Sequence, residues 1–293
     1  MPTKKKPWKF IEKSGHVHEL QLHGIKKGWE QWILLLADEH WDNPKCNRDL
    51  LKKHYDQAVE RDALILSFGD LFCAMQGKFD KRSSKDDVRP EHQEGNYLDR
   101  LVETAAEWYA PYADRLLLIG QGNHEISILK HHETNLLDRL AERLRAGGGI
   151  TRTGGYAGWV RFHFFRGRHS HSQRLYYMHG FGGGGPVTQG KIDWNRLQTF
   201  VDADIMIQGH VHYKELFPVP RVSLSETSNV VRKIMHMVRV GTYKDEYGTG
   251  GSNWHIEKGR GPRPMGGYWL RYYYKNENGQ DHGIHREFTE TET

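Results

Sequence analysis

The sequence predicts an α/β fold, because short apolar runs alternate with helical patterns along much of the chain. Several of the runs are almost continuously apolar, as expected for strands of a sheet that is covered on both faces. Each run is followed by polar residues and glycines that would end a strand. The five predicted strands are Trp32–Ala37, Ala63–Phe68, Arg115–Ile119, Leu175–Met178 and Asp204–Ile207.

Two apolar stripes at helical spacing predict helices between these strands. The first stripe extends from Leu50 to Val59. The second is longer, extends from Ile126 to Leu144, and ends at the glycines of residues 147–149. Glycine directly after the last periodic residue is a common way for a helix to end.

The chain has 293 residues, which is enough for one large domain or two small ones. We expect a Lys-rich N-terminal arm at residues 1–29, followed by a single domain at residues 30–293. The polar, mixed-charge stretch at residues 74–96 predicts a loop inserted into this domain. There is no internal repeat and no clear second domain.

The composition narrows the class of protein. With 42 basic and 37 acidic residues, the formal net charge is +5, which is consistent with an anionic partner. Two cysteines, Cys46 and Cys73, provide no disulfide framework and suit a reducing cytoplasm. No apolar run approaches the ~20 residues that a membrane span requires. The basic N-terminus lacks the apolar segment of a secretory signal. We therefore expect a cytoplasmic protein without a membrane partner.

A side chain that can bind a metal follows each of the five predicted strands. The carboxyl ends of strands in an open α/β sheet converge on one crevice, so these side chains should meet there. Imidazole with carboxylate suits Mn, Fe, Zn or Ni better than Ca or Mg. Seven ligands are too many for one tetrahedral ion and about right for two ions that share a carboxylate. The candidate ligands are Asp38, His40, Asp70, Asn123, His179, His210 and His212.

The order of these residues resembles the calcineurin-like metallophosphoesterase superfamily. The resemblance covers residues 38–212, and each motif follows a predicted strand. A single Gly-Asp pair is uninformative, but five motifs in the family's order are a specific signal. The motifs are Asp38-Glu39-His40, Gly69-Asp70, Gly122-Asn123-His124-Glu125, His179-Gly180 and Gly209-His210-Val211-His212.

The resemblance implies a two-sheet α/β sandwich flanked by helices, with a dinuclear metal centre. One ion would be held by Asp38, His40 and His212, and the other by Asn123, His179 and His210. Asp70 would bridge the two ions. The expected cofactors are two divalent transition-metal ions, with Mn first and Fe, Zn or Ni as alternatives.

The resemblance also implies the reaction. A metal-bound hydroxide would attack the phosphorus of a phosphoester, and His124 would act as the general acid for the leaving oxygen. Glu125 is expected to orient the turn or the following helix. The chain has no G-x-S-x-G elbow and no P-loop, which are the motifs of competing hydrolase and NTPase classes.

The residues after Gly69-Asp70 narrow the subfamily. Purple acid phosphatases place a Tyr three residues after this Asp, and Ser/Thr protein phosphatases place Asp-Arg there. This chain has Cys73-Ala74 instead, which disfavours both groups. The pattern is most similar to the small cytoplasmic and phage-like metallophosphoesterases.

The expected substrate is a phosphodiester of nucleic acid or nucleotides. A phosphomonoester, as for a phosphatase, is the alternative, and a non-catalytic scaffold or nucleic-acid-binding module is a third. Basic side chains at the rim should contact the phosphate backbone. His169 and His171 are expected to lie in a hairpin turn rather than in a second metal site. The predicted rim residues are Arg166, Arg168 and Arg174, with the Lys78–Arg89 segment, Arg260 and Arg263.

Overall fold

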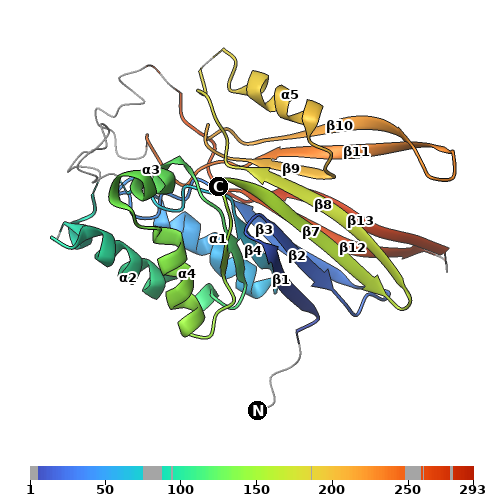
Figure 1. The fold of residues 1–293 in the computed structure, drawn as a ribbon, viewed down its shortest axis with the longest axis horizontal. Helices are drawn as coiled ribbons and strands as arrows, with labels where there is room; N and C mark the ends of the chain where they lie inside the picture. The colour runs from blue at the N-terminus through green and yellow to red at the C-terminus, as the bar shows by residue number, and fades with distance from the viewer. Residues whose placement is uncertain are drawn as a thin grey trace.

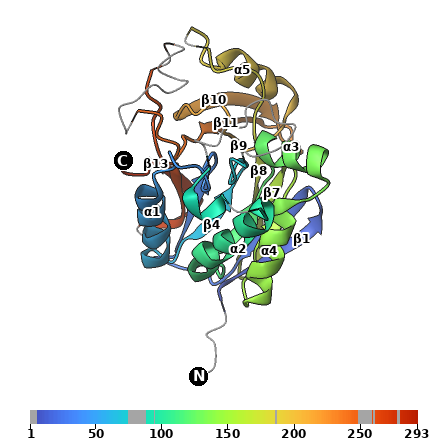
Figure 2. The ribbon, with the colours of Figure 1, turned by 90° about the vertical axis from the view of Figure 1, so that its left-hand side faces the viewer.

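The computed structural model describes residues 6–74, 88–93, 95–185, 187–247, 259, 261–277 and 280–293. Two β-sheets pack face to face, and helices lie on the outer faces of the pair (Figures 1 and 2). This arrangement confirms the predicted two-sheet α/β sandwich flanked by helices.

The first sheet has seven strands in the order β1-β2-β7-β8-β9-β11-β10. Three of its strand pairs are parallel: β2 with β7, β8 with β9, and β9 with β11. Three antiparallel hairpins, β1–β2, β7–β8 and β10–β11, complete it. The strands are β1 Trp8–Ser14, β2 Val17–Leu22, β7 Ala157–Arg166, β8 His169–Met178, β9 Ile205–Gln208, β10 Glu215–Leu224 and β11 Val230–Arg239.

The second sheet has six strands in the order β13-β12-β3-β4-β5-β6. Strands β3 to β6 are parallel to one another, and β12 is antiparallel to both β3 and β13. The strands are β3 Glu30–Leu36, β4 Leu64–Ser67, β5 Leu116–Ile119, β6 Arg152–Thr153, β12 Tyr268–Glu277 and β13 Gln280–Glu290.

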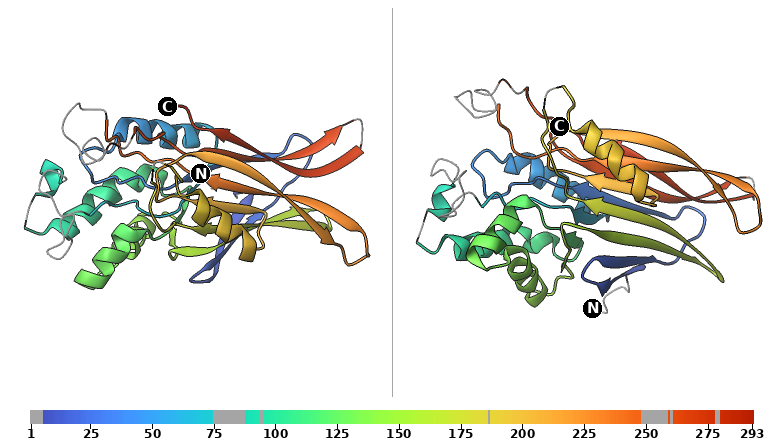
Figure 3. Two further views of the ribbon diagram at one scale, coloured as in Figure 1. Left: turned by 90° about the horizontal axis from the view of Figure 1, so that it is seen from above. Right: turned by 45° about the horizontal axis from the view of Figure 1, so that its top comes forward.

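Helices cover the outer face of each sheet. On the six-stranded sheet, α1 (Arg48–Glu60), α2 (Tyr97–Tyr109) and α4 (Leu136–Ala146) share a core with β3, β4 and β5. On the seven-stranded sheet, α5 (Lys191–Phe200) packs Trp194 and Leu197 against Met206 and Met237. Short 3-10 helices occur at Pro90–His92 and Ala110–Tyr112. The view from above in Figure 3 separates the helical side from the long hairpins.

A third apolar core fills the space between the two sheets. Leu20 and Phe162 of the first sheet and Ile33, Leu66 and Leu270 of the second are completely buried there. Alternate residues of β3 therefore face two cores: Ile33 and Leu35 point between the sheets, and Leu34 and Leu36 point toward the helices. This double burial explains why the strand reads as a continuous apolar run.

All five predicted strands are present, and the predicted helix at residues 50–59 is α1. The long stripe from Ile126 to Leu144 differs, because it forms two helices, α3 (Asn123–His132) and α4. The break falls at Glu133, whose φ of 52° is left-handed, and Asn135 then caps α4 by accepting from the Asp138 N–H at 3.2 Å. Local capping chemistry thus divides a stripe that is periodic in sequence.

The N-terminal region also differs from the prediction. The sequence predicts a basic arm at residues 1–29, whereas β1 and β2 within it are strands of the seven-stranded sheet. Leu20 and Leu22 are buried between the sheets, so the sheet extends across the expected boundary at residue 30. Most of the predicted loop at 74–96 lies outside the described residues. Within the described parts of the chain, no helix is both long and apolar enough to cross a membrane.

Candidate metal centre

The predicted ligands come together at the carboxyl ends of five strands. Asp38 and His40 follow β3, Asp70 follows β4, and Asn123 begins α3 just after β5. His179 follows β8, and both His210 and His212 follow β9. Because β3, β4 and β5 belong to one sheet and β8 and β9 to the other, the site is built where the edges of the two sheets meet.

Asp38, His40 and His212 form a first group. Their ligand atoms all lie within 4.8 Å of one another. Asp38 Oδ1 is 3.2 Å from His212 Nε2 and 3.9 Å from His40 Nε2, and the two Nε2 atoms are 3.3 Å apart. Asp38 is completely buried and His40 is 2% exposed, so these groups are held away from water.

Asp70, His179 and His210 form a second group with the same spacing limit of 4.8 Å. Asp70 Oδ2 is 3.1 Å from His179 Nε2. The amide oxygen of Asn123 is 2.8 Å from His210 Nδ1, which places Asn123 beside this group. Asp38 Oδ1 lies 3.9 Å from His179 Nε2, so the two groups adjoin.

Both carboxylates divide their oxygens between the backbone and the histidines. Asp38 Oδ2 accepts the His210 N–H at 2.8 Å, while Asp38 Oδ1 faces His40 and His212. Asp70 Oδ1 accepts the His124 N–H at 3.0 Å, while Oδ2 faces His179. One oxygen thus fixes the orientation of each carboxylate, and the other is presented to the shared space.

Unsatisfied buried atoms show that the site fits metal ions. Asp38 Oδ1 and His179 Nε2 are buried, and apart from their close approaches to other ligand atoms neither makes a well-directed hydrogen bond to a described residue. A buried polar atom without a partner costs about 1–3 kcal/mol, so such atoms are rare unless something binds them. Mixed imidazole and carboxylate donors are the set that transition metals prefer. The residues present therefore fit a pair of such ions.

Charge coupling inside the second group is strong. Burial alone would lower the pKa of His179, but the Asp70 and Asp38 carboxylates outweigh it and raise the pKa to about 10. Burial would raise the pKa of Asp70, but His179 and His124 hold it well below its usual range. Without metal, the pair therefore keeps a proton that a bound cation would displace.

The backbone at the site is strained. Five of the seven predicted ligands have a positive φ, which is uncommon outside glycine. Each such residue costs on the order of 1–3 kcal/mol, and residues of this kind cluster at functional sites. The strained ligands are Asp38, His40, Asp70, His210 and His212, with φ between 46° and 69°.

Two glycines leave room for the carboxylates. A Cβ atom at Gly122 would overlap the side chain and backbone nitrogen of Asp70. A Cβ atom at Gly209 would overlap the Asp38 carboxylate. The glycines of these two motifs are therefore required by the close approach of the chain to the ligands.

Glu125 holds the Asp70 loop against the start of α3. Its carboxylate accepts three backbone N–H groups, from Gly122 at 2.9 Å, Phe72 at 2.8 Å and Asp70 at 3.2 Å. Burial, with a contribution from Asp70, raises the pKa of Glu125 to about 8. Glu125 thus orients both the turn and the helix, as expected from the sequence.

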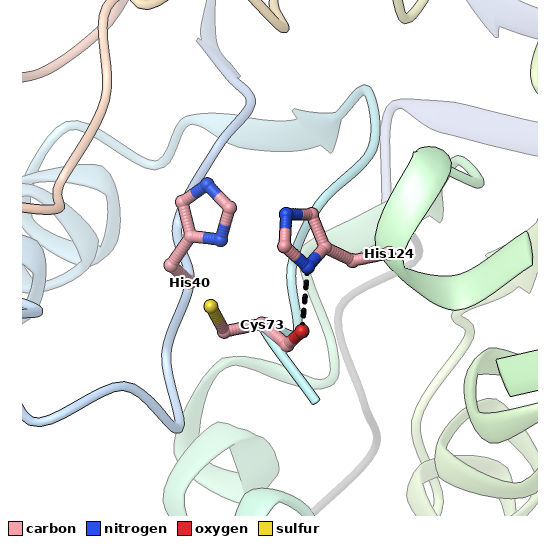
Figure 4. Close-up of side chains that lie close together, drawn as sticks. All are labelled: His40, Cys73 and His124. Carbon is pink, nitrogen blue, oxygen red and sulfur yellow. Dashed lines mark hydrogen bonds between the residues drawn. The ribbon is translucent and has the colours of Figure 1, made fainter. Parts of the chain in front are cut away.

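His124 lies at the edge of the two groups and is 12% exposed. Its Nδ1 donates to the Cys73 carbonyl oxygen at 2.6 Å, as Figure 4 shows. This bond directs Nε2 toward the centre, where it lies 3.9 Å from Asp70 Oδ2. The ring centroid of His124 is 5.0 Å from that of His40.

Two supporting segments were not predicted from the sequence. Tyr156 packs its ring 5.5 Å from that of His179 and donates from its hydroxyl to the Gly180 carbonyl. After β11, the Tyr243 N–H and the Thr242 hydroxyl donate to the Asp38 carbonyl at 3.0 Å and 2.8 Å. The second segment reaches the site because β11 is parallel to β9 and its carboxyl end lies at the same edge, a pairing that the sequence does not show.

The structure does not place the predicted rim arginines at the metal centre, so the prediction of their position is wrong. These arginines are Arg166, Arg168 and Arg174. Arg166 and Arg168 flank the turn of the β7–β8 hairpin, at the end of β8 opposite His179. At ~3.3 Å per residue, the ten residues of β8 separate the turn from the site by roughly 30 Å. Arg174 is paired with Asp202 at 3.0 Å. His169 and His171, predicted in the hairpin turn, lie in β8 just after it.

Arg263 is the described rim residue that lies near the site. It donates to the Gly184 carbonyl at 3.3 Å, and its guanidinium lies 3.9 Å from the centre of the Tyr213 ring. Gly184 is in the loop after His179, and Tyr213 follows His212 directly. Arg260 and most of the Lys78–Arg89 segment lie outside the described residues.

Comparison with known proteins gives only remote similarity. No protein-family model and no curated protein sequence matches the chain. Among solved structures, Vps29 of Chaetomium thermophilum is 12% identical with a TM-score of 0.35, over 89% of this chain and 96% of that one. A metallophosphoesterase from Sphaerobacter thermophilus is 13% identical with a TM-score of 0.28, over 88% of both chains. GAP50, an anchor in the inner membrane complex of Plasmodium, is 11% identical with a TM-score of 0.37, over 89% of this chain and 84% of that one.

With TM-scores below 0.5 these matches carry no argument, and the five ordered motifs are independent of them. The motifs occupy the carboxyl ends of strands in both sheets, and the two groups of histidine and aspartate lie side by side there. In the order of its motifs, the chain resembles the calcineurin-like metallophosphoesterase superfamily.

Proposed function

We propose that this protein is a dinuclear metal-dependent phosphoesterase of the calcineurin-like superfamily. The observation that carries the proposal is the pair of adjoining ligand groups, each with a buried carboxylate oxygen turned toward histidines. Asp38, His40 and His212 would hold one ion. The other would be held by His179, His210 and Asn123, with Asp70 shared between the two.

The two ions would supply Lewis-acid charge for the phosphoryl oxygens and activate water. The protein's own part is to hold the ligands in place before the ions arrive. Backbone N–H groups already fix Asp38 and Asp70, and Glu125 fixes the loop that carries Asp70. Ligand positions set in advance reduce the reorganisation that binding and reaction would otherwise require.

His124 is the proposed general acid. Its Nδ1–H donates a hydrogen bond to the Cys73 carbonyl. The proton that His124 would deliver to the leaving oxygen is therefore the one on Nε2. The carbonyl bond also stabilises the imidazolium form that the acid needs. After the transfer, the ring is neutral and still held by the same bond, ready to regain a proton from water.

The proposed substrate is a phosphodiester of nucleic acid or nucleotides. Support comes from the formal charge of +5 and from basic residues near the site. Arg263 is tied to the loops after His179 and His212. Lys244 pairs with Glu246 at 2.9 Å and lies close enough to His40 to lower the pKa of that histidine, although burial and His124 lower it more. A diester leaves a substituent on each side of phosphorus, and such residues suit the extended anion.

A substrate panel with added Mn²⁺ tests the proposal. The panel contains nitrophenyl mono- and diesters together with single- and double-stranded oligonucleotides. We expect turnover of diesters that disappears with a chelator and in the Asp38→Asn variant. A preference for monoesters over every diester would assign a phosphatase instead. Two bound ions without turnover of any ester would favour a non-catalytic scaffold.

A further inference from the structure

A third group of metal-binding side chains adjoins the proposed pair of ions. His40, Cys73 and His124 place one ligand atom each within 4.8 Å of the others. Figure 4 shows the Cys73 sulfur and the two imidazole rings facing one common space. The residues come from three segments: the loop after β3, the loop after β4, and the start of α3.

A separate observation indicates that this group binds something. His40 is 2% exposed, and its Nδ1 makes no hydrogen bond to any described residue. Its Nε2 already faces Asp38 and His212 in the first group. Metal-binding histidines normally use their second nitrogen for a carbonyl, a carboxylate or water, so an unsatisfied Nδ1 at this depth calls for a ligand.

Neighbouring contacts prepare the group for a thiophilic ion. Asn43 donates an amide N–H to Cys73 Sγ at 3.2 Å, a contact that fixes the position of the sulfur. The Nδ1–H of His124 is held by the Cys73 carbonyl, which leaves Nε2 as the ligating nitrogen. Thiolate with imidazole is a donor set for zinc or cadmium, whereas the proposed catalytic pair contains no sulfur.

We propose that His40, Cys73 and His124 form a third site that binds thiophilic divalent ions such as Zn²⁺ or Cd²⁺ and thereby inhibits the protein. Binding replaces the Cys73 S–H proton, which leaves to solvent, with a metal–sulfur bond. It also occupies Nε2 of His124 and draws His40 away from the first group. The inhibitory consequence rests on the proposed function, but the binding itself does not.

Cadmium alone is the probe, because a Cd²⁺–thiolate bond has an ultraviolet charge-transfer band that imidazole and carboxylate ligands do not produce. We expect the wild-type protein to develop this band stoichiometrically and the Cys73→Ala variant to lose it. Cys46→Ala is the matched control, since Cys46 is also a buried free thiol but lies outside the group. His124→Ala should weaken the affinity for cadmium at least tenfold, and thermal unfolding checks that each variant is folded.

Inhibition is measured separately with Mn²⁺-loaded protein and a nitrophenyl diester. Added Cd²⁺ should inhibit the wild type and the Cys46→Ala variant at much lower concentration than Cys73→Ala. Absence of the band at saturating Cd²⁺, or a band that survives in Cys73→Ala, would overturn the third site. A band without any esterase activity would leave the third site standing and refute the proposed function instead.

Discussion

Both ends of the sandwich hold several histidines, yet among the described residues only one end has the features of a metal centre. At the carboxyl ends of the parallel strands, histidines surround two buried carboxylates. At the opposite end, a cavity between the β7–β8 and β12–β13 hairpins is lined by Arg166, His169, His171 and His282. No carboxylate of the described residues lines that cavity.

The difference between the two ends shows which features distinguish a metal-binding group of histidines from other histidines. Near the strand ends, backbone N–H groups fix each carboxylate, and five ligands have a strained backbone. At the far end, Arg166 donates to the Tyr274 hydroxyl at 3.1 Å and packs on its ring, which is a structural contact. Histidine density alone is therefore a weak predictor, whereas histidine with an oriented, buried carboxylate is a strong one.

The largest effect should come from removing the shared carboxylate. Asp70→Asn keeps the shape of the side chain but removes the charge that we propose to be shared by the two ions, so both ions should be lost. We expect metal affinity to fall roughly 10²–10³-fold, beyond the 10–100-fold typical of outer-shell partners. Elemental analysis and calorimetry measure it. The far-end variant His171→Asn is the control, and two tightly bound ions in Asp70→Asn would contradict the arrangement.

The next effect separates chemistry from metal binding. His124→Ala should retain both ions and lose about 10²–10⁴-fold in turnover, as expected for a missing general acid. The loss should shrink for nitrophenyl esters, whose leaving group needs little protonation. His169→Ala at the far end should leave turnover unchanged. Equal losses for good and poor leaving groups would remove His124 from the acid role.

A third effect concerns stability behind the site. His54 is buried, its Nε2–H donates to the Glu292 carbonyl at 2.7 Å, and its Nδ1 accepts from the Tyr243 hydroxyl at 2.6 Å. Burial lowers the pKa of His54 from 6.5 to about 4. Between pH 6.5 and about 4, the imidazole of His54 is protonated in the unfolded chain but not in the folded protein. The contribution of His54 to the free energy of unfolding is therefore complete above pH 6.5 and is lost as the pH falls toward 4.

This contribution can be measured by difference. At ~1.4 kcal/mol per pKa unit, His54 accounts for up to about 3 kcal/mol of the decrease in the free energy of unfolding on acidification. Denaturant unfolding of metal-free protein from pH 7 to 4 should show a smaller decline for His54→Gln than for the wild type. Exposed His16→Gln should decline like the wild type. An identical pH profile for His54→Gln would show that the buried neutral histidine is not the cause.

The smallest effect tests which arginine contacts substrate. Arg263→Ala should raise KM for oligonucleotides a few-fold and reduce the salt dependence, because a phosphate contact is lost. The same substitution should barely change KM for bis-nitrophenyl phosphate, which is too short to extend along the rim. Arg166→Ala should alter neither substrate, since it lies at the far end of β8. The reverse pattern would place the binding surface on the β7–β8 hairpin.

The sequence alone determined the five strands that carry the candidate ligands, the order of those ligands and their convergence. Continuous apolar runs such as Leu34–Ala37 can only be buried on both faces, and parallel strands end at one edge. The polar residues that follow such runs must therefore meet, whatever the details of the loops. The same local reasoning identified Asn123, His124 and Glu125 at the mouth of β5.

Only the tertiary structure decided which charges could reach that edge. Arg166 precedes His179 by few residues in the chain, but an antiparallel hairpin places it at the opposite end of the sheet. Lys244 and Arg263 are distant in sequence, yet strand pairing brings their loops to the site. Side-chain reach depends on the direction of a strand and on which strands pair. Those pairings join segments far apart in the chain, and no local pattern encodes them.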